Sequence, residues 1–182
     1  MKLMPSLKDL IKPKWLWWKW IIIHHSWSKD HGTLDWGGIR KYHMSYRIDG
    51  HIVTKTEYIR RLDIRDGKLF QPPWSDIAYH FGIEKVGGHY EILIGRSILV
   101  HGGHCKGMNR SSLGICFIGN YDEVEPPEEM LTFAAERLIV PLLKISGYST
   151  DCIVGHRKYA KKSCPGKRFR LDVLQNIVKQ IN

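Results

Sequence analysis

Trp20-Ile21-Ile22-Ile23-His24-His25 carries the clearest structural signal in this sequence. A tryptophan followed by three β-branched isoleucines is typical of a strand that is buried on both faces of a sheet. The run ends in two histidines. Because ligands of α/β proteins bind beyond the carboxyl ends of buried strands, we expect functional side chains at this point.

Helix and strand patterns alternate along the rest of the chain. Gly87-Gly88 suits a two-residue hairpin turn between two strands. Pro126-Pro127-Glu128-Glu129 favours a helix start, and Pro141 should kink or end that helix. The patterns together predict an α/β fold, with a central mixed β-sheet flanked by α-helices. We expect strands over 20–25, 78–86, 89–94, 113–118 and 152–155, and helices over 35–44, from 126 onwards and over 171–181.

A single domain accounts for most of the 182 residues, because a chain of this length can bury a sufficient core without covalent staples. We expect this domain over residues 20–182, after a basic, tryptophan-rich segment over residues 1–19. Residues 46–73 mix charged residues with glycines and a Pro-Pro pair. This composition predicts an insertion that carries a small hairpin.

The formal charge of +10 and the pI near 9.5 favour an anionic partner. Charge alone does not choose between nucleic acid, a membrane surface and an acidic cell-wall polymer. The basic residues are scattered and form no nucleic-acid motif, so we expect no nucleic-acid partner. Trp15, Trp17 and Trp18 suit a membrane interface, but packing of these rings onto the domain is the simpler interpretation. We expect a monomer.

Four cysteines at this length are too few for a disulfide scaffold, which favours reduced thiols or metal ligands. Charged residues interrupt the apolar run near the N-terminus, and no small-residue cleavage site follows it. The run is also shorter than the ~20 residues of a membrane-spanning helix. We therefore expect a cytoplasmic protein without an export signal of its own.

His24, His156 and Cys164 each lie where a regular element is expected to end. Neutral imidazole and thiolate suit zinc, and three protein ligands leave a fourth position open, as in catalytic zinc sites. A hydrogen-bonded structural role is the alternative for each histidine, and spacing alone does not decide between the two. Adjacent residues of a strand face opposite ways, so we expect His25 to be structural or to support a ligand.

Four segments resemble the zinc-dependent N-acetylmuramoyl-L-alanine amidases, a family that includes amidase-type phage lysozymes, muropeptide-recycling amidases and peptidoglycan recognition proteins. They occur in the family's order and extend roughly from Trp20 to the C-terminus, and the last is the most specific. The segments are Ile21-Ile22-Ile23-His24-His25-Ser26, Asp76-Ile77-Ala78-Tyr79-His80-Phe81, Gly107-Met108-Asn109 through Leu113-Gly114-Ile115, and Gly155-His156-Arg157 through Ser163-Cys164-Pro165-Gly166.

The resemblance implies that His24, His156 and Cys164 bind one zinc ion in a surface groove. It places the family's catalytic tyrosine on Tyr79 and its catalytic lysine on Lys162. An ammonium can stabilise the oxyanion formed at the lactyl carbonyl, and a tyrosine can orient water or carry its proton. Without the resemblance, Lys162 would be a solvated lysine and Tyr79 a half-buried strand residue. The candidates for binding substrate are His80, His104 and Asn109, and His101 is a further candidate for lining the groove.

The expected function is hydrolysis of the amide bond between N-acetylmuramic acid and L-alanine in peptidoglycan, by an endolysin that acts on the wall after its release. A non-catalytic peptidoglycan-binding module of the same fold and a cytoplasmic muropeptide-recycling amidase are the alternatives. Some recycling relatives carry a glutamate where this chain has Cys116. Glu84 and Glu91 are possible substitutes for that carboxylate, although solvent-facing strand positions explain them more simply.

Overall fold

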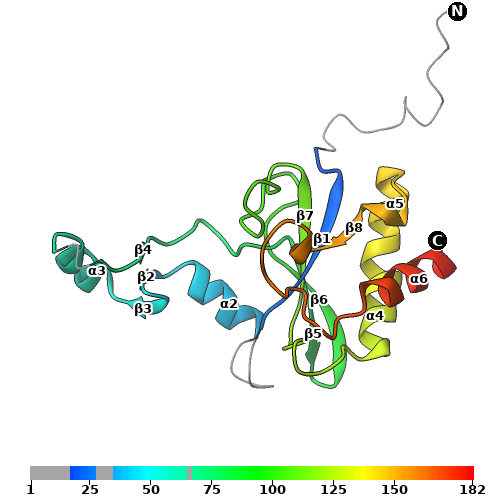
Figure 1. The fold of residues 1–182 in the computed structure, drawn as a ribbon, viewed down its shortest axis with the longest axis horizontal. Coiled ribbons are helices and arrows are strands. Elements are labelled where there is room, and N and C mark those ends of the chain that lie inside the picture. Colours follow the sequence, from blue (N-terminus) through cyan, green and yellow to red (C-terminus); the bar gives the residue numbers. More distant parts are fainter. Residues whose placement is uncertain (1–16, 28–34, 65–66) are drawn as a thin grey trace, which may run out of the picture.

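The computed structural model describes residues 17–27, 35–64 and 67–182. A five-stranded sheet forms the centre, helices cover one of its faces, and a smaller three-stranded sheet projects on the other side (Figure 1). The expectation of an α/β domain with a mixed central sheet flanked by helices is confirmed.

The strand that holds the two histidines lies inside the larger sheet. This strand, β1 (Trp20–His25), runs parallel to both of its neighbours, β7 (Ser112–Phe117) and β8 (Ile153–Gly155). β5 (Phe81–Val86) continues the sheet parallel to β7, and β6 (His89–Ile94) is the antiparallel partner of β5. The strand order is β6-β5-β7-β1-β8, and because β1 is parallel to both β7 and β8, the carboxyl ends of these three strands meet at the same end of the sheet.

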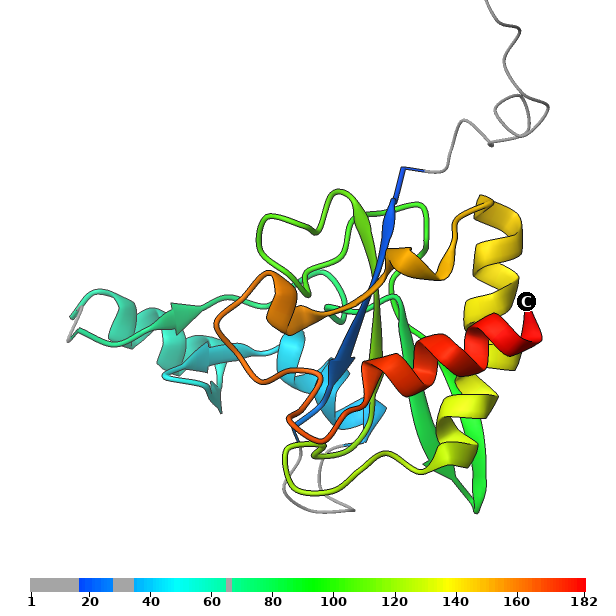
Figure 2. The same cartoon turned by 45° about the vertical axis from the view of Figure 1, so that its right-hand side comes forward.

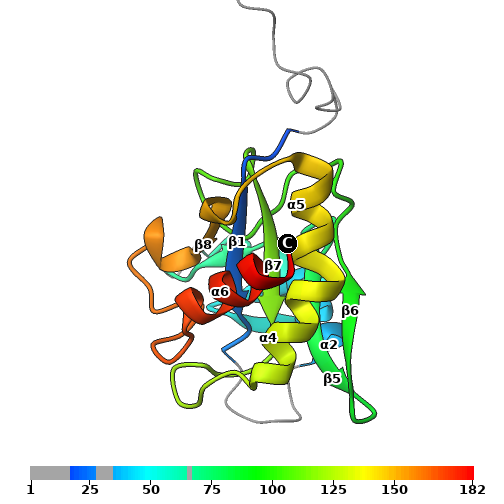
Figure 3. The same cartoon turned by 90° about the vertical axis from the view of Figure 1, so that its right-hand side faces the viewer.

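Helices cover one face of this sheet (Figures 2 and 3) and bury its apolar side chains. α4 (Glu128–Ala134), the π-helical turn Ala135–Ile139 and α5 (Val140–Ser146) form one helical run, which α6 (Leu171–Ile181) contacts. Removal of these side chains from water is the main force that holds the layers together. Buried residues of this core include Ile21, Ile23, Leu113, Ile115, Phe117, Leu138 and Val178.

The helical run does not end at Pro141, where the sequence predicted a kink or an end. Proline cannot donate a backbone hydrogen bond, and its ring crowds the preceding turn of a helix. The π-helical turn Ala135–Ile139 comes directly before α5, so Pro141 lies in the first turn of a new α-helical segment. The missing donor is tolerated at that position, and the helix continues to Ser146.

α2 (Trp36–His43) packs on the opposite face of the sheet, which confirms the helix predicted over 35–44. Asp35 caps its first turn by accepting a hydrogen bond from the Gly38 amide at 2.6 Å. Trp36 packs over Gly82 of β5, where a Cβ atom would clash with the indole ring. The glycine therefore allows α2 to approach the sheet closely.

The smaller sheet belongs to residues 45–73, which we call the arm. Its strand order is β3 (His51–Val53), β2 (Tyr46–Ile48) and β4 (Phe70–Gln71), and α3 (Lys55–Leu62) packs against it. The predicted small hairpin is confirmed as β2 and β3. α3 and β4 were not predicted from the sequence, because both are short and the apolar pattern is weak in this segment.

Trp17 and Trp18 pack onto the domain, as in the simpler interpretation of these residues. Trp18 is 1% exposed, and the indole N–H of Trp17 donates to the Ile98 carbonyl at 2.7 Å. Trp15 and the rest of residues 1–16 lie outside the described residues. The cysteines Cys105, Cys116, Cys152 and Cys164 are free thiols. In the described parts of the chain, no helix has both the length and the apolar character needed to cross a membrane.

Candidate metal centre

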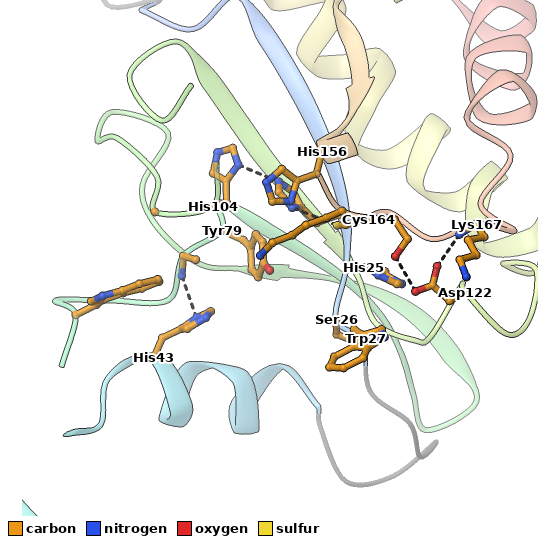
Figure 4. A pocket seen from close by; sticks show the side chains of 16 residues that line it. His25, Ser26, Trp27, His43, Tyr79, His104, Asp122, His156, Cys164 and Lys167 are labelled. Atoms are coloured by element: carbon orange, nitrogen blue, oxygen red, sulfur yellow. Dashed lines mark hydrogen bonds between the residues drawn. The ribbon is translucent and has the colours of Figure 1, made fainter. Parts of the chain in front are cut away.

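His24, His156 and Cys164 converge at the carboxyl end of the central strands (Figure 4). His24 is the fifth residue of β1, and His156 directly follows the neighbouring parallel strand β8. Cys164 reaches them from the loop that precedes α6. One ligand atom from each residue lies within 4.8 Å of the other two, and Cys164 Sγ is 3.6 Å from His24 Nδ1. Three segments far apart in the sequence thus form one compact donor set.

His25 lies on the other face of β1, as strand alternation predicted. Its Nδ1 accepts a hydrogen bond from the Tyr121 amide at 3.2 Å, and its ring stacks on the Tyr121 ring. These contacts fix the chain after β7, and His25 also lines the pocket beside the three converging residues.

His104 is packed directly behind His24. Its Nδ1 is 2.9 Å from His24 Nε2, and its Nε2 is 3.4 Å from the Ser112 carbonyl. Gly102 and Gly114 surround the ring so closely that a Cβ atom on either would clash with it. His104 was predicted from the sequence to be a substrate contact. The structure shows that it lines the pocket and also supports His24.

Burial keeps the two imidazoles in the neutral form that binds metal. It is the largest cause that lowers the pKa of His24, with His104 and His156 as further causes, and it also lowers the pKa of His156. Lys162 adds to both shifts through its positive charge. Burial raises the pKa of the Cys164 thiol to about 11. A coordinated dication reverses this last effect, because it favours the thiolate.

The donor set opens into a pocket of about 630 Å³. Tyr79 lines it with its ring centroid 5.1 Å from that of His24, and burial raises the pKa of its phenol well above the ordinary value. Lys162 is exposed and also lines the pocket, whereas its neighbour Lys161 is not among the lining residues. Tyr79 precedes β5 instead of lying within it, because that strand begins at Phe81 and not at residue 78 as predicted.

Two predicted substrate contacts lie away from the pocket lining. His80 is fully buried: its Nδ1 accepts from the Gly114 amide at 2.9 Å, and its Nε2 lies 3.1 Å from the Val100 carbonyl. Asn109 accepts from the Cys105 amide at 2.8 Å. Both side chains stabilise loops behind the site. His101 is exposed and packs against Trp17.

Asp122 is the carboxylate of the described pocket lining, and it was not predicted from the sequence. It accepts hydrogen bonds from the Ser163 hydroxyl and the Lys167 amide, both at 2.8 Å. Slight burial raises its pKa, but these hydrogen bonds lower it more, so the group stays ionised. Glu84 instead accepts from the Trp36 amide at 3.1 Å, and neither it nor Glu91 lines this pocket.

His43 and Trp74 form the far wall of the pocket, and neither was predicted from the sequence as a site residue. Their rings stack with centroids 4.8 Å apart, and His43 Nδ1 accepts from the Ala78 amide at 3.2 Å. Figure 4 shows His43 across the pocket from His156, with Asp122 and Lys167 to one side. The one feature of the sequence that could have indicated both residues is that His43 lies just before the arm and Trp74 directly follows it.

The sequence of this chain is similar to those of known proteins. The family model described as N-acetylmuramoyl-L-alanine amidase matches residues 14–167. Peptidoglycan-recognition protein LB of Drosophila melanogaster is 34% identical over 113 residues, which cover 61% of this chain and 47% of that protein. The endolysin of Klebsiella phage KP32 is 35% identical over 95 residues, which cover 50% of this chain and 60% of the endolysin.

The fold is also found among solved structures. Drosophila PGRP-LB superposes with a TM-score of 0.54 at 28% identity, over 82% of this chain and 75% of that chain. This chain spans about half to three fifths of the length of the two relatives matched by sequence.

Proposed function

Because this chain belongs to the N-acetylmuramoyl-L-alanine amidase family, we propose that it hydrolyses the amide bond between N-acetylmuramic acid and L-alanine in peptidoglycan. The observation that carries the proposal is the convergence of His24, His156 and Cys164, whose ligand atoms lie within 4.8 Å of one another beside an open pocket. The relative named as a peptidoglycan-recognition protein supports a peptidoglycan substrate.

The three side chains fit one zinc ion. Two neutral imidazoles and one thiolate are ligands that zinc prefers, and three protein ligands leave room for a fourth from solvent or substrate. When bound, zinc acts as a Lewis acid that polarises a carbonyl and makes water a stronger nucleophile. His24, His156 and Cys164 would hold the ion in the lining of the pocket.

Tyr79 and Lys162 would have different roles in hydrolysis of the scissile amide. The raised pKa keeps Tyr79 a protonated phenol, which can donate a hydrogen bond or orient the attacking water. The ammonium of Lys162 can stabilise negative charge that develops on the lactyl carbonyl oxygen. His104 would hold the His24 ring in place while these groups act.

A binding module without catalysis is the second candidate, because one relative is named as a recognition protein. The complete His-His-Cys donor set favours hydrolysis over recognition alone. Within the hydrolase proposal, the phage relative favours a lytic enzyme over a recycling enzyme. In this proposal, the protein is made in the cytoplasm and acts on the cell wall after its release. The charge of +10 would draw the enzyme to anionic wall polymers, so lytic activity should fall as salt is added.

Product analysis from purified walls tests the proposed reaction. The wild-type protein should release peptides that begin with L-alanine, and a chelator should abolish this release until zinc is restored. Cys164→Ser should lose the release as well. Cys152→Ser is the matched control, because Cys152 is also a buried free thiol but packs in the core below the helices. A fully zinc-loaded protein that releases no peptide would support the recognition module instead.

A further inference from the structure

Trp27 is an exposed aromatic residue in the lining of the pocket, and the metal centre does not use it. It lies shortly after β1, and its side chain is 60% exposed, whereas the other tryptophans of the described residues are buried or half-buried. Apolar surface stabilises a fold only where it is removed from water. Packing of the domain therefore does not account for a large indole at this position.

The backbone of Trp27 has a conformation that bulky residues rarely adopt. Its φ is 55°, in the left-handed region, where a Cβ atom crowds the backbone. Asp49 is the other non-glycine residue with positive φ in the described parts of the chain, and the tight turn between β2 and β3 requires it there. Trp27 instead follows β1, which pairs with parallel strands, so a hairpin does not explain it. Retained strain of this kind is typical of functional sites.

Hydrogen bonds to the chain after β7 fix Trp27 in this position. The Trp27 amide donates to the Gly119 carbonyl at 3.1 Å, and the Ser26 amide donates to the Phe117 carbonyl at 3.1 Å. The Gly119 amide donates to the Ser26 hydroxyl at 2.9 Å. The two chain segments thus stay paired beyond the ends of β1 and β7. A side chain on such a fixed backbone is pre-organised, so less entropy is lost when it binds a ligand.

The pocket offers aromatic surfaces at two separate places. Trp27 follows shortly after the metal ligand His24 in the sequence, whereas His43 and Trp74 form the far wall. Figure 4 shows Trp27 well apart from His43, with the side chain of His156 apart from both. The amide that the proposed reaction cuts joins a sugar to a peptide, so the substrate extends from the metal centre in two directions. Each direction can therefore meet its own aromatic surface.

The chemistry around Trp27 indicates which part of the substrate it meets. A pyranose ring has flat faces of C–H groups and an edge of hydroxyl groups, so it fits an aromatic face with polar side chains nearby. Ser26, Asp122 and Lys167 line the same pocket and offer a hydroxyl, a carboxylate and an ammonium. We propose that Trp27 binds a sugar ring of the glycan strand by stacking its indole on one face of that ring. This inference rests on the proposed function, which makes the substrate a peptide attached to N-acetylmuramic acid.

Two substrates with the same scissile amide test the inference on the zinc-loaded protein. One is a disaccharide-tripeptide, in which N-acetylglucosamine and N-acetylmuramic acid precede the peptide. The other is the lactoyl-tripeptide, which keeps the lactyl carbonyl and the amide but has no sugar ring. The wild-type protein should cleave the first with a kcat/KM about 10-fold higher or more, as expected for burial of one aromatic face against a ligand. Chromatography of the released tripeptide measures both values.

Variants then assign this preference to one side chain. Trp27→Gly removes the indole and suits the positive φ, so the backbone should keep its path. The ratio of the two kcat/KM values should fall about 10-fold in Trp27→Gly and less in Trp27→Phe. Leu99→Ala, which removes an exposed side chain that does not line the pocket, is the control and should keep the full ratio. If Trp27→Gly slows both substrates equally, Trp27 only shapes the metal centre, and the proposal is overturned.

Titration with the peptide-free disaccharide adds a measurement that needs no cleavage. In protein with isotope-labelled tryptophan, the indole N–H signal of Trp27 is the one that Trp27→Phe lacks. This signal should shift as the disaccharide is added, and the signal of the buried Trp18 should not. A Trp27 signal that stays in place at saturating disaccharide contradicts the proposal.

The wild-type protein alone separates this inference from the proposed function. Equal kcat/KM values for the two substrates contradict the role of Trp27 and leave the proposed hydrolysis intact. A zinc-loaded protein that cleaves neither substrate contradicts the proposed function, and the role of Trp27 with it.

Discussion

His24 and His104 share a 2.9 Å hydrogen bond between Nε2 of the first ring and Nδ1 of the second. His104 Nε2 faces the Ser112 carbonyl, which can only accept, so the proton of the neutral His104 ring belongs on Nε2. His24 therefore donates from its own Nε2. This arrangement leaves the lone pair of His24 Nδ1 facing Cys164, whose Sγ is 3.6 Å away.

We predict that His104→Ala lowers zinc affinity by about 10- to 100-fold, the usual effect of removing a group that orients a histidine ligand. His104→Asn should lose less, because its amide oxygen can still accept from His24. Competition with a chromophoric chelator measures both affinities. Wild-type affinity in His104→Ala would show that the His24 ring is fixed by other contacts.

Lys162 and Lys161 form a matched pair for testing transition-state stabilisation. Only Lys162 is among the lining residues of the pocket, although both side chains are exposed. Lys162→Met should lower kcat by about 10²- to 10³-fold, as expected for loss of one group that stabilises an oxyanion. Lys161→Met should stay near the wild-type rate. Steady-state kinetics on a soluble muramoyl peptide gives both values, and equal losses would refute a special role for Lys162.

Tyr79→Phe removes one hydroxyl beside the metal ligands and leaves the ring in place. We expect kcat to fall by about 10²-fold or more, the range of general acid–base contributions, while the zinc content remains one per chain. Tyr90→Phe on β6 is the control, because Tyr90 is not among the residues that line the pocket. An active Tyr79→Phe would mean that the phenol only fills space.

Acid should destabilise the fold through buried histidines. Burial is the main cause that lowers the pKa of His80 from 6.5 to about 4. The unfolded chain therefore binds more protons than the folded chain between these values, and stability falls as the pH falls through this window. The full shift corresponds to ~3 kcal/mol. His80→Asn can still accept from the Gly114 amide, and it should lose less of its melting temperature between pH 6.5 and 4 than the wild-type protein does.

Local patterns explain why most of the fold could be predicted. The isoleucine run of β1, the Gly87-Gly88 turn and the spacing of apolar residues in α6 are each set by neighbours in the sequence. α3 and the π-helical turn could not be predicted, because tertiary packing decides them. The arm contains few buried apolar residues, and the turn before Pro141 depends on the continuous helix around it.

In the site, too, local sequence patterns predicted some residues, whereas the position of others depends on tertiary packing. Placement at strand ends indicated His24 and His156, and strand alternation separated His24 from His25. The lining residues Asp122 and Trp74 enter the pocket through loops, whose paths no local pattern fixes. The burial of His80 and the contact of His104 with His24 depend equally on how distant segments pack.

X-ray absorption at the zinc edge, combined with the metal content of the purified protein, measures the proposed ligand set itself. We predict one zinc ion per chain with one sulfur neighbour at about 2.3 Å and nitrogen or oxygen neighbours at about 2.0 Å. Cys164→Ser should lose the sulfur signal, and Cys152→Ser should keep it. A wild-type protein that holds no zinc, or whose zinc has no sulfur neighbour, would contradict the assignment of His24, His156 and Cys164.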